Sequence, residues 1–265
     1  SVQLADGSGL FSPHVVAAMG GSAAPSMGTD GTGARLMQAL GHEITPLYPA
    51  LVQLRCSHPA LKGLKGIRTQ AELTLMIDDQ AVLRETGELL LTDYGVSGVC
   101  VFQLSREAAP ALAQGRSVRL AVNFLPEIPS LLPWLDARIR QLAPASLLTL
   151  TTGVLPRLLA QTVIREARLS PDMPAEALSE SEKQALCGAL SAFPLVVTGT
   201  QGFANAQVTR GGVSLADVDP STMASRLFDG LHIIGELLDV DGPCGGYNLH
   251  FAFAGALAVA KAIAG

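Results

Sequence analysis

The two ends of the chain share one pattern, in which an apolar strand ends in glycines and leads to a helix. At the N-terminal end, the apolar run His14–Met19 leads into Gly20-Gly21. At the C-terminal end, Leu231–Ile234 leads into Gly235. Such strands are typical of buried parallel strands, so the two ends are expected to form one α/β domain that the intervening chain interrupts. The helices of this domain are expected at about residues 34–40 and 248–264, and further strands at 1–4, 10–18, 195–200 and 206–209.

The middle of the chain follows different patterns. From residue 44 to about 125, short β-rich segments alternate with turn residues, which predicts a mostly antiparallel β unit. Its strands are expected at Leu51–Cys56, Ala71–Ile77, Ala81–Glu85, Glu88–Thr92 and Val118–Phe124. One helix is expected within it at Val99–Ala113, shortened by Pro110.

From residue 126 to 192, apolar residues recur at three- and four-residue spacing, which predicts a helical subdomain. Helices are expected at 131–142, 147–150, 154–167 and 179–192, the last beginning with an S-x-x-E capping box at Ser179–Glu182. The expected division is therefore 1–43 and 193–265 for the outer domain, 44–125 for an inserted β-rich domain and 126–192 for the helical subdomain.

Composition narrows the class of protein. With 48% hydrophobic and 15% charged residues, the chain is globular. A net charge of -5, the lack of a basic stripe and 5% aromatic residues argue against a nucleic-acid partner. The four cysteines form no C-x-x-C pair and are expected to be reduced thiols of a cytoplasmic protein.

No membrane association is expected from the sequence. The N-terminus has no basic region followed by an apolar run, so we expect no signal peptide. No apolar stretch reaches the ~20 residues that cross a bilayer. The apolar end of the chain, Phe251–Ala264, is short, rich in alanine and interrupted by Lys261. It is expected to be a buried core helix.

The segment Gly235–Phe253 is the richest candidate for a site. Its strand end is followed by a loop with acidic residues, and Gly245-Gly246 then opens the last helix. Glycines at a helix N-terminus let a ligand approach backbone N–H groups, and the helix dipole favours negative charge there. The alternative is a tight strand–turn–helix connection without a ligand. Cys244 in this loop is either a small packed residue or a reactive thiol.

This segment, GELLDVDGPCGGYN, resembles the C-terminal FAD motif of the aminoacetone oxidase-like flavoproteins, a family that also includes reductases of bile-acid dehydroxylation. Three further stretches are similar to family motifs in the same order. They are VVAAMGGSAAPSMGTDGTG at Val15–Gly33, LLLTDYGVSG at Leu89–Gly98, and the region Val197–Glu236 with its Gly211-Gly212-Val213. The resemblance spans essentially the whole chain.

The resemblance implies a mixed α/β fold, in which a two-dinucleotide-binding-type FAD domain is interrupted by a β-barrel-like domain and a helical subdomain. It implies an FAD-dependent oxidoreductase that carries out hydride chemistry on a small organic substrate. The implied cofactor-binding residues are Gly20, Gly21, Gly211, Gly212, Gly235, Glu236, Asp241, Gly245, Gly246, Tyr247 and Asn248. Of these, Gly20 and Gly21 would lie near the phosphates or the adenosine and Glu236 near the ribityl or pyrophosphate region. Gly211 and Gly212 would approach the isoalloxazine, whose pyrimidine Gly245–Asn248 would border.

The sequence departs from the family at several positions. Met19 replaces a threonine, Asp93 a histidine, Val99 a proline and His250 a glutamine-like residue. An unperturbed aspartate is ionised at neutral pH and cannot reproduce the proton chemistry of a histidine. By position alone, the candidates for catalysis are Asp93, Tyr94, Ser97 and His250. The other histidines have no metal-ligand spacing, so no metal site is expected.

The family's G-x-G-x-x-G segment, which binds the FAD pyrophosphate, has no counterpart in the sequence. The glycines of Gly28–Gly33 have a different spacing, which is typical of a surface loop. The expectation is therefore an FAD domain without its N-terminal segment, which forms a homo-oligomer or pairs with a partner chain that supplies this segment. The alternative is a truncated, FAD-free remnant that works as a binding module or as half of a split enzyme.

Overall fold

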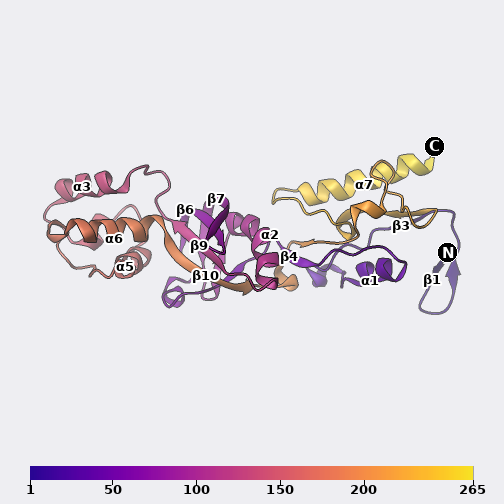
Figure 1. Cartoon of the computed structure of the whole chain (residues 1–265), viewed down its shortest axis with the longest axis horizontal. Helices are drawn as coiled ribbons and strands as arrows, with labels where there is room; N and C mark the ends of the chain where they lie inside the picture. Colours follow the sequence, from indigo (N-terminus) through magenta and orange to yellow (C-terminus); the bar gives the residue numbers. More distant parts are fainter. Residues whose placement is uncertain (265) are drawn as a thin grey trace. The chain divides into compact units, whose positions relative to one another are not determined.

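The computed structural model describes residues 1–264 and divides the chain into two compact units. Unit 1 comprises Ser1–Val52 and the chain from Gln201 onward, and unit 2 comprises Gln53–Thr200. The observed junctions thus follow residues 52 and 200, and the β-rich segment shares one unit with the helical segment. The fold is mixed α/β (Figure 1).

Unit 2 is built on a closed antiparallel barrel with the strand order β10-β5-β8-β7-β6-β9. The strands are β5 (Leu54–Ser57), β6 (Arg68–Ile77), β7 (Gln80–Leu91), β8 (Gly95–Ser97), β9 (Val118–Asn123) and β10 (Phe193–Thr200). Alternate residues of β6 are buried, as expected for strands with one face in the core. β10 pairs with β5 and β9 and closes the barrel, so this strand does not belong to the outer domain as the sequence had suggested.

The two strands expected at 81–85 and 88–92 form one continuous strand, β7. Gly87, which lies between the two expected segments, belongs to this strand. A side chain at this position would come within 3.5 Å of Cys100 Cβ on α2 (Val99–Ala113). This is an ordinary van der Waals distance, so the glycine lies where helix α2 packs on the sheet rather than in a turn.

Helix α2 has the predicted bounds, but Pro110 does not shorten it. The remaining helices of unit 2 are α3 (Leu131–Leu142), α4 (Leu147–Leu150), α5 (Arg157–Glu166) and α6 (Glu180–Ser191). The predicted capping box of α6 is confirmed, because the Ser179 hydroxyl accepts from the Glu182 amide and the Glu182 carboxylate accepts from the Ser179 amide.

Unit 1 has a three-layered centre. β3 (Val15–Ala17) and β12 (Leu231–Ile233) form a two-stranded parallel sheet, which confirms the predicted parallel strands. Helix α1 (Thr32–Ala39) packs on one face, where Met37 joins a core cluster with Ile233. Helix α7 (Tyr247–Ala264) packs on the other face, where Gly255 lies beside Ile234. Neighbouring residues of a strand point to opposite faces, so the two helices cover opposite sides of the sheet (Figure 1).

Shorter elements complete unit 1. The strand expected at residues 10–18 is two strands, because Pro13 separates Gly9–Leu10 from β3. The other elements are the hairpin β1 (Val2–Gln3) and β2 (Gly9–Leu10), and the antiparallel pair β4 (Tyr48–Ala50) and β11 (Val208–Arg210). The 3-10 helices among residues 1–264, in both units, are Pro25–Met27, Leu61–Leu64, Ala175–Ala177, Phe203–Asn205, Leu215–Asp217 and Gly235–Leu237.

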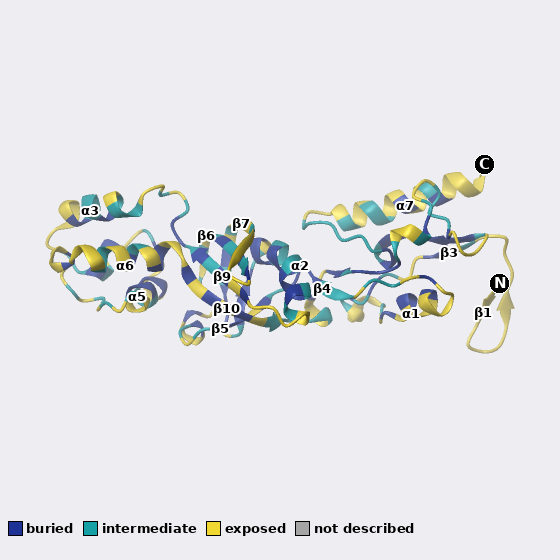
Figure 2. Ribbon diagram, viewed as in Figure 1, coloured by how far each residue is buried: buried dark blue, intermediate teal, exposed yellow. Residues whose placement is uncertain are grey.

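The last helix is not the buried core helix that its composition suggested. Of its residues, only Gly255 and Val259 are buried, and Figure 2 shows most of α7 in the colours of exposed residues. The helix is long and apolar enough to cross a membrane by length and composition. It is the only helix among residues 1–264 with that property. Its outward face is apolar and uncovered.

Candidate functional site

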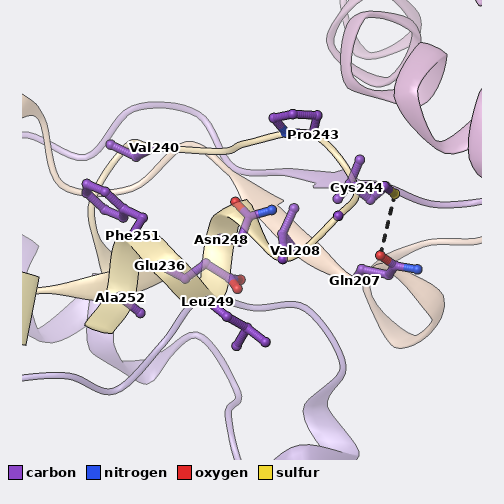
Figure 3. A pocket seen from close by; sticks show the side chains of 13 residues that line it. Gln207, Val208, Glu236, Val240, Pro243, Cys244, Asn248, Leu249, Phe251 and Ala252 are labelled. Carbon is purple, nitrogen blue, oxygen red and sulfur yellow. Dashed lines mark hydrogen bonds between the residues drawn. The ribbon is translucent and has the colours of Figure 1, made fainter. Parts of the chain in front are cut away.

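A pocket of about 410 Å³ lies at the N-terminus of α7 (Figure 3). One wall is the loop before the helix together with the first turns of α7, and the other walls come from β11, from Leu51 and from the segment after β12. Most of the lining side chains are apolar, and Gln207, Glu236 and Asn248 are the polar ones beside Cys244. The lining residues are Leu51, Gln207, Val208, Glu236, Val240, Pro243, Cys244, Gly245, Gly246, Asn248, Leu249, Phe251 and Ala252.

The loop before α7 is closed by one side chain. The side-chain Oδ1 of Asn248 accepts from the backbone N–H of Gly242 at 2.7 Å, and its side-chain Nδ2 donates to the backbone carbonyl of Gly242 at 3.0 Å. This double hydrogen bond fixes the turn that contains Gly245 and Gly246. Asn248 is predicted to border a ligand. In the structure its side chain also holds the loop in shape through these two hydrogen bonds.

Gly245 and Gly246 are the two positions of this loop that require glycine. Both have positive φ angles, 122° and 89°, which other residues rarely adopt. A Cβ atom at Gly246 would meet no atom within 4 Å, so the backbone there borders open space. At the N-terminus of an 18-residue helix, such bare backbone can approach an anionic or strongly polar ligand closely.

Cys244 lies at the rim of the pocket beside Gln207. Its thiol is 3.7 Å from the Gln207 Oε1 oxygen, to which it can donate a weak hydrogen bond (Figure 3). The sequence left open whether Cys244 is a packed residue or a reactive thiol. The structure places it in the lining of the pocket, beside a polar partner.

Glu236 is the carboxylate of the site. Its Oε1 oxygen accepts from the backbone amide of Thr209 at 2.9 Å. Burial raises the pKa of Glu236 above its ordinary value, and hydrogen bonds from the Thr209 hydroxyl and amide oppose the rise. The Thr209 amide of β11 therefore holds the carboxyl group in place. Because burial raises its pKa, the group loses its proton at a higher pH than a glutamate on the surface does.

Thr209 connects Glu236 to the loop after β3. Its hydroxyl accepts from the backbone amides of Ser22 at 2.7 Å and Ala23 at 3.0 Å. Gly21 lies inside this arrangement, because a Cβ atom there would collide with both the Glu236 carboxylate and the Thr209 hydroxyl. The sequence predicted Gly21 and Glu236 separately, and the structure brings them into contact.

Gly211 and Gly212 have a different reason to be glycine. A Cβ atom at Gly211 would overlap the Pro46 carbonyl, and one at Gly212 would lie 2.6 Å from the Leu237 carbonyl oxygen. The space beside both glycines is therefore filled by the backbone of the protein itself. Both border a small void of about 10 Å³ that Gly20, Gly21 and Glu236 also line.

The remaining predicted residues of unit 1 lie outside the pocket lining. Gly235 packs against Ala252, with 3.5 Å between its Cβ position and that of the alanine. Tyr247 is 61% exposed, and its ring lies beside Gly245. Asp241 is half-buried in the loop, and His250 is an exposed residue of α7.

Three of the candidates for catalysis belong to unit 2. Asp93 is exposed and forms an ion pair with Lys65 at 2.7 Å, and the hydrogen bond from Lys65 lowers the pKa of this carboxyl group. Tyr94 is half-buried, and its carbonyl accepts from the Cys56 amide at 2.9 Å. Ser97 is buried at the end of β8.

Sequence reasoning missed most of the pocket walls. Ala252 could have been found from helical spacing, because it follows Asn248 by four residues on one face of the last helix. Thr209 carried only a weak signal, its position two residues before Gly211. Leu51 comes from a distant segment, and no local pattern marks it. Among residues 1–264, no group of three or more metal-ligating side chains could hold a metal ion.

Comparison of the sequence with known proteins places the chain in one family. The family model described as HI0933-like protein Rossmann domain matches residues 1–262. The 3-dehydro-bile acid delta(4,6)-reductase of Clostridium scindens is 38% identical over 253 residues, which cover 94% of this chain and 62% of that protein. The ribosomal RNA dihydrouridine synthase of Escherichia coli is 32% identical over 251 residues, which cover 93% and 60%.

The matching region is thus nearly the whole of this chain but about three-fifths of each relative. The ribosomal RNA dihydrouridine synthase of Haemophilus influenzae shows the same proportions, with 28% identity over 94% of this chain and 60% of that protein. The assignment to the aminoacetone oxidase-like proteins within this wider group stays a prediction.

Proposed function

The chain belongs to the HI0933-like family of Rossmann-type oxidoreductases, and from this membership we propose that it forms the flavin-facing part of an FAD-dependent oxidoreductase. The observation that carries the proposal is the pocket at the N-terminus of α7, where the bare backbone of Gly246 borders open space opposite apolar walls. The bile-acid reductase relative supports an oxidoreductase, because its name states a reduction.

The chemistry of the pocket lining supports the ring system of a flavin as its occupant. Apolar side chains such as Val208, Val240 and Phe251 suit the faces of an aromatic ring. The backbone N–H groups at the start of α7 suit the edge of the ring where negative charge develops. Glu236 offers a carboxyl group that can accept from, or donate to, a hydroxyl group of the cofactor chain.

When bound, a flavin supplies hydride transfer, and the protein supplies orientation and electrostatics. In this chain, α7 would stabilise the negative end of the ring through its dipole, and Asn248 would keep the loop in the required shape. Thr209 would hold the carboxyl group of Glu236 in one position. The apolar walls would keep water from the ring.

We propose a small organic substrate rather than RNA. Proteins that bind RNA neutralise phosphates with clustered basic residues, and this chain has a net charge of -5. The helical segment 126–192 has no basic excess, since its lysine and arginine residues are matched by aspartate and glutamate residues. A substrate without phosphates fits this charge balance better.

The proton donor, if the substrate needs one, would not be Asp93. Its carboxyl group is paired with Lys65 and has a lowered pKa, so it is ionised at neutral pH and has no proton to give. Tyr94 and His250 stay candidates for proton transfer. Substituting each by phenylalanine and glutamine, respectively, and measuring the pH dependence of turnover would separate them.

The proposal is tested by titrating the purified chain with FAD and following flavin fluorescence. Gly246→Ala adds a methyl group to the open backbone and should weaken FAD binding by about tenfold or more, because close approach is lost. Gly41→Ala is the matched control. Gly41 also has a positive φ, 93°, and no atom within 4 Å of its Cβ position, but it lies two residues beyond the end of α1 and outside the pocket lining.

Equal backbone strain in the two variants allows their effects on the pocket to be compared. Weaker FAD binding in Gly246→Ala with unchanged binding in Gly41→Ala would support the site. Binding that both variants reduce equally, or a chain that binds neither FAD nor riboflavin, would contradict the proposal.

A further inference from the structure

Leu51 combines two features that rarely occur together. Its φ angle is 51°, in the left-handed region that residues with a Cβ atom normally avoid. Its relative exposure is 1%, so this residue lies inside the protein rather than in a surface turn. Among residues 1–264, six residues other than glycine have a positive φ, and of these only Leu51 and Met223 are large and apolar. Glycine or asparagine would adopt this backbone at a lower cost, so the backbone alone does not explain a leucine.

The backbone of Leu51 is held at the end of a short strand pair. β4 ends at Ala50, which pairs with Val208 of β11. The Leu51 carbonyl accepts from the Gln207 amide at 3.3 Å. The neighbours Ala50 and Val52 are both fully buried. The chain is therefore fixed on both sides of Leu51, so a substitution there changes the side chain more than the path of the backbone.

The Leu51 side chain borders the pocket at the N-terminus of α7 rather than a main core. It belongs to none of the three clusters of buried apolar side chains that residues 1–264 form. It does line the pocket, as Leu249 does. Because Leu51 is 1% exposed and Leu249 is 67% exposed, Leu51 lies at the inner end of the pocket and Leu249 at its mouth. An apolar side chain at the inner end can contact a ligand without blocking its entry.

We propose that Leu51 is a specificity-determining residue of the pocket, whose side chain forms the inner wall against which the flavin ring packs. The inference rests on the flavin site proposed above. A planar ring gains dispersion contacts from a branched aliphatic side chain. Glycine would relax the backbone but leave a gap behind the ring, and asparagine would place a polar group there without a partner. Leucine thus keeps an apolar wall at the cost of a strained backbone, as is common at ligand sites.

The alternative is a purely structural role, and Met223 provides the comparison. Met223 has the same kind of backbone, with a φ of 56°, and packs on the core cluster of unit 1. It is not among the residues that line the pocket. The two residues share a large apolar side chain on a left-handed backbone and differ in contact with the pocket. Their variants therefore separate strain and packing from contact with a ring.

The experiment titrates the full chain with FAD and with lumiflavin, which is the ring system alone, and follows flavin fluorescence. Leu51→Gly should weaken the binding of both ligands by about tenfold, because the ring loses the apolar contact of one leucine side chain. The relaxed backbone of this variant does not compensate, since the ring does not contact the backbone there. Met223→Gly is the matched control and should leave both dissociation constants unchanged.

Leu51→Asn is the second variant, because asparagine is close to leucine in shape and tolerates the left-handed backbone. It should also weaken lumiflavin binding, since an amide without partners replaces the apolar wall. Thermal denaturation of each variant without ligand shows whether the chain still folds. The asparagine variant decides the question where the glycine variant does not fold.

Four results would overturn the inference. They are lumiflavin binding that both Leu51 variants leave unchanged, an equal loss of binding in Met223→Gly, and weaker binding of FAD with unchanged binding of lumiflavin, which would place Leu51 against the dinucleotide chain. The fourth is the loss of folding in both Leu51 variants while Met223→Gly folds, which would make the role of Leu51 structural. In each of these cases the wild type still binds FAD, so the proposed function stands. A wild-type chain that binds neither ligand would contradict the proposed function and the inference together.

Discussion

The two units of the molecule differ in how completely each one covers its own apolar surface. In unit 2, six strands close into a barrel, so no strand of the barrel has an open edge. In unit 1, a parallel pair carries the centre of the fold, and β3 has an open edge. Of the 22 large hydrophobic residues that are exposed in the described chain, 17 belong to unit 1, the smaller of the two units.

The difference indicates that unit 2 is stabilised by its own core, whereas unit 1 leaves apolar surface that a ligand or a partner can cover. The barrel encloses one continuous core that reaches into the helices of unit 2. The core of unit 1 is smaller, and its candidate ligand pocket lies next to the uncovered helix α7. Binding sites often lie in such less enclosed regions, where part of the free energy of folding comes from a ligand or a partner.

The largest expected effect concerns autonomous folding. A fragment that comprises Gln53–Thr200 should fold by itself, because its ends are neighbours in the barrel, where Leu54 pairs with Thr200. We expect one cooperative thermal transition by circular dichroism, at a temperature close to that of the same transition in the full chain. A fragment without a cooperative transition would show that the barrel depends on unit 1, and the contrast between the units would fail.

A matched pair of leucine substitutions gives the next largest effect. Leu73→Ala in the barrel removes a fully buried side chain and should lower the free energy of unfolding by about 2–5 kcal/mol. Leu257→Ala on α7 removes a side chain that is 64% exposed and should change it by less than about 0.5 kcal/mol. Urea denaturation of both variants measures the difference. A large loss for Leu257→Ala would mean that the outer face of α7 is already covered in solution.

The sequence predicted the helices and strands of both units better than it predicted which strands pair and which helix faces are buried. The bounds of α2, α3 and α4 and the capping box at Ser179 depend on local patterns, and the structure has them as expected. The closing of the barrel by β10 was missed, because strand pairing joins segments that are far apart in the chain. The exposure of α7 was missed for a related reason: apolar composition indicates that a helix will be covered, but not by what.

The candidate site shows the same division. Gly245, Gly246, Asn248 and Glu236 were predicted from the resemblance of their segment to a family motif, and they line the pocket. The hydrogen bonds by which Thr209 connects Glu236 to the loop after β3 were not predicted, because they join three segments that fold together only in space. The collision that requires Gly212 is likewise with backbone about 25 residues away, which no spacing rule identifies.

The smallest expected effect is on the pH dependence of stability, and it is seen by comparing one carboxyl group from each unit. Burial raises the pKa of Glu236 above 4.5, so the folded protein holds this proton more tightly than the unfolded chain does. The stability that Glu236 contributes is therefore complete below the unfolded pKa and is lost as the pH rises through the raised folded pKa. Hydrogen bonding by Ser179 lowers the pKa of Glu182 in unit 2, so its contribution is present above the unfolded pKa and is lost as the pH falls through the folded pKa.

Glu236→Gln and Glu182→Gln remove these titrations, and the two variants should diverge from the wild type in opposite directions. Urea denaturation at several pH values between about 3 and 7 measures the change. Relative to the wild type, Glu236→Gln should gain stability as the pH rises, because the wild type alone must then ionise a carboxyl group that burial disfavours. Glu182→Gln should lose stability as the pH rises, because it lacks the carboxylate that accepts from Ser179. Parallel curves for the two variants would mean that Glu236 is as well solvated as Glu182, which would remove the physical distinction between the pocket of unit 1 and the surface of unit 2.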